Sequence, residues 1–231
     1  MREWQAEPGL QIAIDGPSGS GKGTIATVLA AEIGLPVLDT GLLYRLIGAV
    51  SIERGIDPED GDALAKLAAG MLASLTWTEA GVSFEGELWT GKLRSEETGA
   101  AASKVAAQPK VREQLLGLQR KLAASGCIMD GRDIGTVVLV NAPAKFFLTA
   151  TVRERARRRW MQLNGQDSTG ELEQVLAELK KRDQRDRERQ HAPLCQAEDA
   201  IVVDSTTLRV DEVVDRMLGV LERRGLIQAI I

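Results

Sequence analysis

Three glycines and a lysine near the start of the chain are the residues whose types and spacing have the clearest chemical use. The glycines stand at positions 16, 19 and 21, and Lys22 follows the last of them. Glycine adopts backbone conformations that a Cβ forbids, so successive N–H groups of such a turn can point inward at anionic oxygens. The lysine adds a mobile positive charge. We therefore expect this segment to hold a polyphosphate.

The residues on either side of this turn strengthen that expectation. Ile12 to Ile14 is a short apolar run typical of a buried strand, and a helical pattern opens at Lys22. The spacing Gly16-x4-Gly21-Lys22, between a strand and a helix, fits the phosphate-loop pattern. The helix would add unpaired N–H groups and the positive end of its dipole.

One position departs from the usual form of such loops and bears on the metal. Gly23 stands where most phosphate loops place a Mg²⁺-binding serine or threonine, and Thr24 comes next. We therefore expect Mg²⁺ near Thr24 to be held mainly through water.

Length, charge and cysteine content exclude several classes of protein. The chain has 231 residues, 44% of them hydrophobic, which is ample for a buried core. Its net charge of −4 argues against a dedicated nucleic-acid binder. Cys127 and Cys195 lie far apart and His191 is the single histidine, so neither a zinc site nor a disulfide framework is indicated. No signal-like or membrane-spanning segment stands out, and we expect a cytoplasmic protein without nucleic-acid or membrane partners.

Alternating apolar runs and helical patterns indicate the fold class. The predicted strands are residues 12–14, 36–38, 127–130, 144–150 and 200–204. Strand and helix in alternation imply a parallel sheet with right-handed crossovers. We predict an α/β fold with a five-stranded parallel sheet flanked by helices. Because ligands bind at the carboxyl ends of such strands, we expect Asp39, Thr40, Tyr44 and Arg45 near the phosphate loop.

The segment between the second and third strands changes character. Residues 75–93 alternate β-forming residues with turns at 80–81 and 85–86, which indicates a small antiparallel meander. Helical patterns precede it at 60–73 and follow it at 94–108. We predict an insertion at 56–107 within a core made of 1–55 and 108–231. Trp77 and Trp89 are expected in the core of the meander.

A charged motif follows the third core strand. Asp130 ends this strand, and Gly131, Arg132 and Asp133 follow directly. An acid at this place in a phosphate-loop protein can orient Mg²⁺ or its waters. The packing of a protein core gives little reason for two acids on either side of an arginine. We therefore expect a functional role for Arg132 and Asp133.

Two arginine-bearing helical segments indicate a lid. The first, from residue 151, carries five arginines, and we expect one or two of them to reach a nucleotide. A polar connection at 164–170 leads to the second, where Arg182, Arg185, Asp186 and Arg189 recur at spacings of three and four. We predict a lid at about 155–190 that closes on phosphates, with His191 incidental. Such a lid excludes water and favours a phosphoryl transferase over a hydrolase.

Seven segments together resemble the bacterial cytidylate kinase family over nearly the whole chain. They are GPSGSGKGT at 16–24, LDTGLLYR at 38–45, KVREQL at 110–115, DGRDIGTVV at 130–138, KRDQRDRER at 181–189, APL at 192–194 and AEDAIVVDSTTL at 197–208. Many nucleoside monophosphate kinases share the phosphate loop. The combination of DTGxxYR, DGRDxGT and RDxRDxxR is much more specific.

The resemblance implies a P-loop kinase core with an inserted monophosphate-binding region, ATP and Mg²⁺ as donor and cofactor, and CMP or dCMP as phosphate acceptor. The residues it implies for ATP are Gly16, Pro17, Ser18, Gly19, Ser20, Gly21, Lys22, Gly23 and Thr24, with Arg158 against the adenine. Those it implies for the acceptor are Thr40, Tyr44, Arg45, Ser103, Arg112, Arg132, Asp133, Arg182, Asp186 and Arg189. The catalytic set is Lys22, Arg132, Asp133, Arg182, Asp186 and Arg189, and the metal residues are Thr24 and Asp130, through water.

These roles agree with the chemistry of the side chains. Arginines 45, 112 and 132 can each donate two hydrogen bonds to a monophosphate. Ser103, Arg112 and Arg132 can also recognise the edge of the cytosine base. Asp133 and Asp186 can accept hydrogen bonds from a sugar hydroxyl. No general base is obvious, and none is needed, because the acceptor phosphate is already an anionic nucleophile. Leu139-Val140-Asn141 and His191 depart from the family pattern without touching an expected contact.

Three other interpretations stay open at this point. One is a kinase of UMP, AMP or shikimate on the same core. Another is a non-catalytic module that binds ATP to change partners. The third is a nucleic-acid-dependent ATPase, which should have a glutamate after Asp130, where Gly131 stands. Nothing in the sequence demands more than a monomer.

Overall fold

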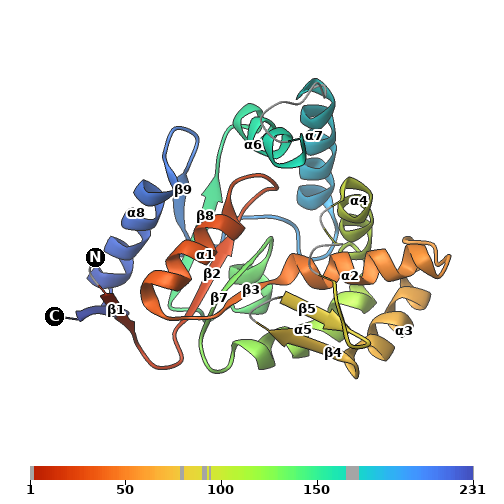
Figure 1. The fold of residues 1–231 in the computed structure, drawn as a ribbon, viewed down its shortest axis with the longest axis horizontal. Helices are drawn as coiled ribbons and strands as arrows, with labels where there is room; N and C mark the ends of the chain where they lie inside the picture. Colours follow the sequence, from red (N-terminus) through yellow and green to blue (C-terminus); the bar gives the residue numbers. More distant parts are fainter. Residues whose placement is uncertain (1–2, 79–80, 90–92, 94, 165–171, 231) are drawn as a thin grey trace. The chain divides into compact units, whose positions relative to one another are not determined.

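The chain divides into two compact units, which we describe separately (Figure 1). The computed structural model describes residues 3–78, 81–89, 93, 95–164 and 172–230. The first unit comprises Met1–Leu38, Ala123–Glu188 and Ala192–Ile231. The second comprises Asp39–Leu122 and Arg189–His191. The predicted limits of the insertion, 56–107, remain a prediction.

A five-stranded sheet forms the centre of the fold and confirms the predicted fold class. Its strands are β2 (Gln11–Asp15), β3 (Val37–Asp39), β7 (Cys127–Gly131), β8 (Ala144–Thr149) and β9 (Ile201–Asp204), in the order β3-β7-β2-β8-β9. β2 pairs in parallel with β7 and β8, and β8 with β9. Because β2 is the middle strand, the loop that leaves its carboxyl end has a neighbouring strand on each side.

The first unit contains the helices α1 (Lys22–Ile33), α6 (Val152–Asn164), α7 (Leu172–Glu188) and α8 (Val210–Arg223). Two of them, α1 and α8, share an apolar core with this sheet. Leu29 of α1, Phe146 of β8 and Met217 of α8 belong to one apolar core. α1 packs on α8, and α6 on α7. The helix after the phosphate loop is thus fixed by the core at its back, while its N-terminus is left for the loop.

Three elements were not predicted from the sequence. β1 (Glu3–Ala6) and β10 (Ile227–Ile230) form an antiparallel pair, and η2 (Ile134–Val138) is a short π-helix directly after Asp133. π-helical turns are rare and occur frequently at functional sites. The π-helix η2 therefore bears on the site.

The second unit contains the predicted meander. β4 (Leu75–Thr78), β5 (Gly81–Phe84) and β6 (Glu87–Leu88) form a three-stranded antiparallel sheet, which confirms the pattern read from residues 75–93. Trp89 is buried in the core of this unit and Trp77 is partly buried against it, as expected.

In the described part of this unit, four helices accompany the meander, and two of them approach closely. They are α2 (Thr40–Glu53), α3 (Gly61–Leu72), α4 (Glu96–Val105) and α5 (Pro109–Ala123). α2 packs on α4, where a Cβ added to Gly48 would lie 3.0 Å from Ala101 Cβ. The absence of a side chain at Gly48 therefore sets how near these helices come. Among the described residues, no helix has the length and apolar character required to cross a membrane.

Candidate active site

The glycine-rich loop between β2 and α1 lies directly against the sheet. Gly16 has a φ of +151°, and a Cβ added there would lie 2.0 Å from the carbonyl oxygen of Leu148 in β8, so no other residue fits. Gly21 is the N-cap of α1 in the left-handed conformation, with a φ of 93°. No acidic residue lies in the first turn of α1, and no side chain caps it. The helix N-terminus therefore keeps its affinity for an external anion.

Lys22 folds back over the loop that it follows. Its side chain is buried, and its Nζ donates to the carbonyl oxygen of Pro17 at 2.9 Å and to Ser20 Oγ at 3.5 Å. The positive charge is thus held at the glycine-rich turn. The contact of Lys22 with a phosphate remains a prediction.

Arg155 of α6 supports the loop from behind, a role that the sequence analysis missed. The residue is only 3% exposed. Its guanidinium donates to the carbonyl oxygens of Ala150 at 3.0 Å and Ser18 at 2.9 Å, and to Asp183 Oδ2 at 2.6 Å. A Cβ on Gly19 would lie 2.9 Å from the carbonyl oxygen of Arg155. Arg155 therefore joins the phosphate loop to α7.

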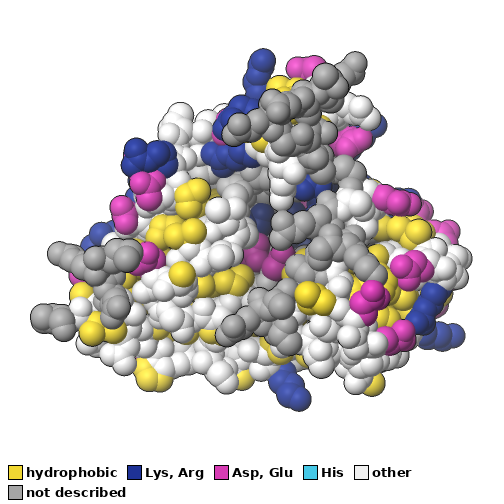
Figure 2. Space-filling view, viewed as in Figure 1, with side chains coloured by type: hydrophobic (Ala, Val, Ile, Leu, Met, Phe, Trp, Pro, Cys, Tyr) yellow, Lys and Arg dark blue, Asp and Glu magenta, His cyan; other side chains and the backbone are white. Residues whose placement is uncertain are grey.

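Arg158, the residue expected against adenine, lies beside the same loop. Its guanidinium donates to Glu154 Oε1 at 2.8 Å, to Ser205 Oγ at 2.9 Å and to the carbonyl oxygen of Ser20 at 3.4 Å. Figure 2 shows Lys and Arg side chains gathered over the region of α6. A hydrogen bond from Arg157, the largest favourable contribution, holds the pKa of Glu154 below its ordinary value. The contact with adenine remains a prediction.

The structure brings together Arg132 and Asp186, two residues expected to bind the acceptor. Arg132 Nε donates to Asp186 Oδ2 at 3.0 Å, and its Nη1 donates to the carbonyl oxygen of Gly131 at 3.1 Å. Asp186, on α7, is 4% exposed, whereas the Arg132 side chain keeps 19% of its surface exposed. The arginine is therefore held in a fixed orientation while part of it faces solvent. Asp133 is buried at the N-cap of η2.

Asp15, the last residue of β2, is a further buried carboxylate near these groups. Its oxygens accept from the backbone N–H groups of Ile134 and Gly135, both at 2.7 Å. Burial raises the pKa of Asp15 to about 6, although both hydrogen bonds act in the opposite direction. The sequence analysis did not single out this residue. The acid-at-strand-end rule that pointed to Asp130 would also have found it.

Other expected acceptor residues lie in the second unit. The Arg112 guanidinium carbon stands 5.6 Å from the centre of the Tyr44 ring, a cation–π arrangement. Arg112 also donates to the carbonyl oxygen of Ala106 at 3.3 Å, and Arg45 donates to that of Leu93 at 2.8 Å. Within this unit the structure therefore joins Tyr44 to Arg112. Thr40 and Ser103 are buried there, and Arg189 is half-buried. Arg182, in the first unit, is also half-buried.

The expected metal residues provide oxygen donors alone. Asp130 is buried at the end of β7, and its neighbour across the sheet is Ile14 of β2, two residues before the loop. Thr24 is exposed in the first turn of α1. A carboxylate and a hydroxyl, completed by waters and phosphate oxygens, suit Mg²⁺. Among the described residues, no three His, Cys, Asp or Glu side chains cluster to hold a metal by themselves.

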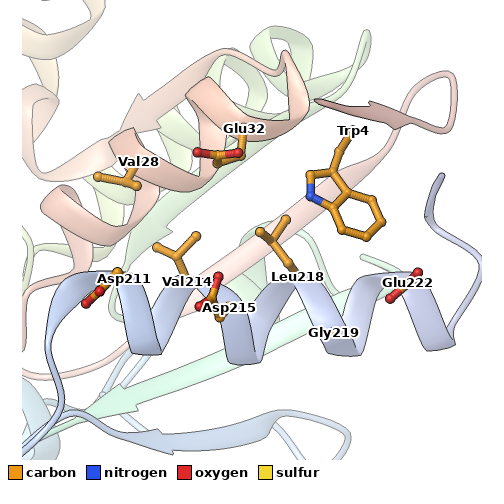
Figure 3. Close-up of a pocket in the computed structure, with 9 residues that line it drawn as sticks. All are labelled: Trp4, Val28, Glu32, Asp211, Val214, Asp215, Leu218, Gly219 and Glu222. Atoms are coloured by element: carbon orange, nitrogen blue, oxygen red, sulfur yellow. The ribbon is translucent and has the colours of Figure 1, made fainter. Parts of the chain in front are cut away.

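A separate groove of about 480 Å³ lies between α1 and α8 (Figure 3). None of the expected site residues lines it, and four of its nine lining residues are acids, which would repel phosphate. The groove is therefore distinct from the phosphate loop. It is lined by Trp4, Val28, Glu32, Asp211, Val214, Asp215, Leu218, Gly219 and Glu222.

A parallel sheet whose central strand leads through a glycine-rich loop into a helix, with a lysine over the loop and arginines behind it, defines a P-loop kinase. The sequence profile described as cytidylate kinase matches residues 12–223. The chain belongs to the cytidylate kinase family, as its motifs suggested.

Individual relatives agree with this assignment. The chain is 47% identical over 218 residues to a cytidylate kinase of Vibrio vulnificus, which covers 92% of this chain and 96% of that protein. It is 44% identical over 219 residues to one of Pseudomonas aeruginosa, covering 93% and 96%. Among solved structures, an uncharacterized protein of Eubacterium ventriosum gives a TM-score of 0.51 at 15% identity, covering 92% and 98% of the two chains. That last likeness shows the fold alone.

Replacing Arg155 by alanine should destabilise the protein strongly. The substitution removes the partner of Asp183, which is 7% exposed, and loss of one member of a buried ion pair costs about 3–5 kcal/mol. Arg157 on the same helix is exposed and pairs with Glu154, so Arg157→Ala should cost no more than about 1 kcal/mol. Urea unfolding of both variants measures the difference. Equal, small losses would contradict the role given to Arg155.

The raised pKa of Asp15 predicts a specific pH dependence of stability. Between the unfolded value of 3.8 and the folded value of about 6, the folded state binds more protons, so this contribution is complete below pH 3.8 and is lost as the pH rises through 6. Asp15→Asn lacks it. Wild type should lose about 2 kcal/mol relative to this variant between pH 4 and pH 7. Urea unfolding at intermediate pH values tests this, and a constant difference would refute it.

Proposed function

We propose that this chain transfers the γ-phosphate of ATP to CMP or dCMP, giving ADP and CDP or dCDP, with Mg²⁺ as cofactor. The observation that carries the proposal is the loop at the end of β2, with Lys22 folded over it, in a chain that matches proteins named cytidylate kinase over most of its length. The proposed residues follow from the family motifs and from the contacts described above.

ATP is the proposed occupant of the phosphate loop. The residues from Gly16 to Thr24 offer backbone N–H groups, the start of α1 and the Lys22 ammonium to the phosphates. Lys22 now donates to a backbone carbonyl, an interaction that a phosphate oxygen can replace with a stronger, charge-assisted one. Arg158, beside Ser205 and the loop, is proposed to contact the adenine.

The acceptor is proposed to bind Arg132 through its phosphate. Arginine presents five donors in a plane, and only two of its nitrogens donate in the hydrogen bonds to Asp186 and Gly131 described above. The remaining proposed acceptor residues are Thr40, Tyr44, Arg45, Ser103, Arg112, Asp133, Arg182 and Arg189. Among them, Arg112 over the Tyr44 ring and Arg45 on a backbone carbonyl have side-chain positions already fixed.

Catalysis then consists of positioning and charge neutralisation. The acceptor phosphate oxygen is already anionic, so no side chain has to remove a proton from it. Lys22 and Arg132 offset charge that spreads over the transferred phosphoryl oxygens. Mg²⁺, held near Thr24 and Asp130 through water, would supply further neutralisation of the β- and γ-phosphate oxygens.

The arginine-bearing helices α6 and α7 are proposed to form a lid. Both carry cations, and exclusion of water would favour transfer to the acceptor over hydrolysis. The polar connection predicted at 164–170 lies, except for its first residue, outside the described residues. We further propose that the protein acts as a monomer in the cytoplasm.

An acceptor panel tests the reaction directly. ADP release would be measured with ATP and Mg²⁺ against CMP, dCMP, UMP, AMP, GMP, dTMP and shikimate at equal concentration. Strong release with CMP and dCMP alone supports the proposal. ATP binding without acceptor-dependent release would instead favour a nucleotide-sensing module, and preference for another acceptor would favour a different kinase.

Lys22→Ala should abolish most turnover and leave the fold intact. A transition-state electrostatic contact of this kind is worth about 100- to 1,000-fold in kcat. Lys66→Ala, which removes an exposed lysine of α3, serves as the matched control and should turn over normally. Circular dichroism would verify folding of both. Wild-type activity in Lys22→Ala would refute the phosphate-loop assignment.

Arg132→Ala should mainly impair use of the acceptor. Loss of a charge-assisted contact to the monophosphate should raise the KM for CMP about tenfold or more and leave the Kd of ATP within about twofold. Arg216→Ala on the exposed face of α8 is the control. If ATP binding were lost and CMP use spared, the division between donor and acceptor residues would be wrong.

A further inference from the structure

Asp15 connects two segments that the proposed reaction uses for different substrates. It is the last residue of β2 and directly precedes Gly16, the first residue of the phosphate loop. Its carboxylate holds the backbone of Ile134 and Gly135, 119 and 120 residues further along the chain. These residues directly follow Arg132 and Asp133. One side chain thus ties the donor loop to the acceptor motif.

The two hydrogen bonds satisfy groups that would otherwise lack partners. Ile134 and Gly135 are the first residues of η2, where a helix has N–H groups without partners inside the helix. Asp133 is the N-cap, but its side chain makes no capping hydrogen bond. Asp15, from another strand, performs the capping instead. A carboxylate at this end also matches the positive end of the helix dipole.

Lys145 of β8 holds the other end of the same segment. Its Nζ donates to the carbonyl oxygen of Val140 at 2.7 Å and to Asp199 Oδ1 at 2.9 Å. A Cβ added to Gly135 would lie 3.1 Å from Lys145 Cδ and 3.3 Å from Asp15 Oδ2. Gly135 therefore fits closely between the two side chains, and η2 has little freedom to shift.

We infer that Asp15 is a positioning residue, which fixes the backbone carrying Arg132 and Asp133 in a set place relative to the phosphate loop. The inference rests on the proposed function, because it concerns how the acceptor residues are aligned with the donor. Asp15 itself need not touch either substrate. Its effect reaches the reaction through Arg132.

The matching substitution is Asp15→Asn. An amide keeps the size of the carboxylate but has one acceptor oxygen, so one of the two backbone N–H groups would face an NH₂ donor. The expected result is a rise of about tenfold or more in the KM for CMP, with the Kd of ATP within about twofold of wild type. Loss of general stability alone would not separate the two substrates in this way.

Two further variants make the comparison specific. Asp215→Asn makes the same chemical change on the exposed surface of α8 and should alter neither constant. Gly135→Ala adds a methyl group against Asp15 and Lys145 without substituting either residue. It should raise the KM for CMP by about threefold. If Asp15→Asn did not fold, as judged by circular dichroism, Gly135→Ala alone would decide.

A spectroscopic signature tests the contact independently of turnover. In a ¹H–¹⁵N NMR spectrum, the amide protons of Ile134 and Gly135 should be shifted downfield in wild type by the carboxylate, and at least one should return upfield in Asp15→Asn. An unchanged KM for CMP in the folded variants, or equal losses for ATP and CMP, would overturn the inference. Absence of CMP-dependent ADP release in wild type would instead overturn the proposed function, so the two failures are distinguishable.

Discussion

The close contact between Gly16 and β8 is the constraint on which the rest of the structure depends. To surround phosphates with N–H groups, the chain must turn at the end of the central strand with its backbone against the Leu148 carbonyl. The strand order β7-β2-β8 places β8 beside the end of β2, where it meets the turn. Arg155 then closes the outer side by binding the Ser18 carbonyl. Sheet order, glycine position and buried arginine therefore serve one anion-binding turn.

One buried and one partly buried ion pair connect α7 to this turn and to the acceptor motif. Asp183 and Asp186, three residues apart and therefore on one side of the helix, pair with Arg155 and Arg132 respectively. Buried pairs of this kind add little net stability, because removing two charges from water offsets their attraction. Their value lies in geometry: a carboxylate fixes the plane of each guanidinium. Any movement of α7 must carry both arginines with it or exchange their partners.

Local patterns in the sequence were sufficient to predict the five-stranded sheet, the phosphate loop and the helices around them. Apolar periodicity and glycine spacing depend only on residues that are near one another in the chain. The position of Asp15 at the end of a strand could have been read from the sequence, but its role could not, because its partner Ile134 lies 119 residues away. Arg155 was missed for the same reason, since Ser18 lies 137 residues from it. Arg155 lies three residues after Val152 and directly before Ala156, which does place it on the inner face of its helix. The family motifs, and no geometric argument, pointed to Ser103 and Arg112. Their roles cannot be derived from periodicity.

Arginine suits position 132 because the side chain there has to bind neighbouring protein groups and a phosphate at the same time. It donates through Nε to Asp186 and through Nη1 to the Gly131 carbonyl, and part of its surface stays exposed. A lysine could present a charge there, but its single nitrogen would have to leave Asp186 to serve a phosphate fully. The planar, five-donor guanidinium can hold its orienting carboxylate and still fork onto an anion. Asp15 then matters for the same reason, since an orientation fixed at the side chain is useful only if the backbone beneath it is fixed as well.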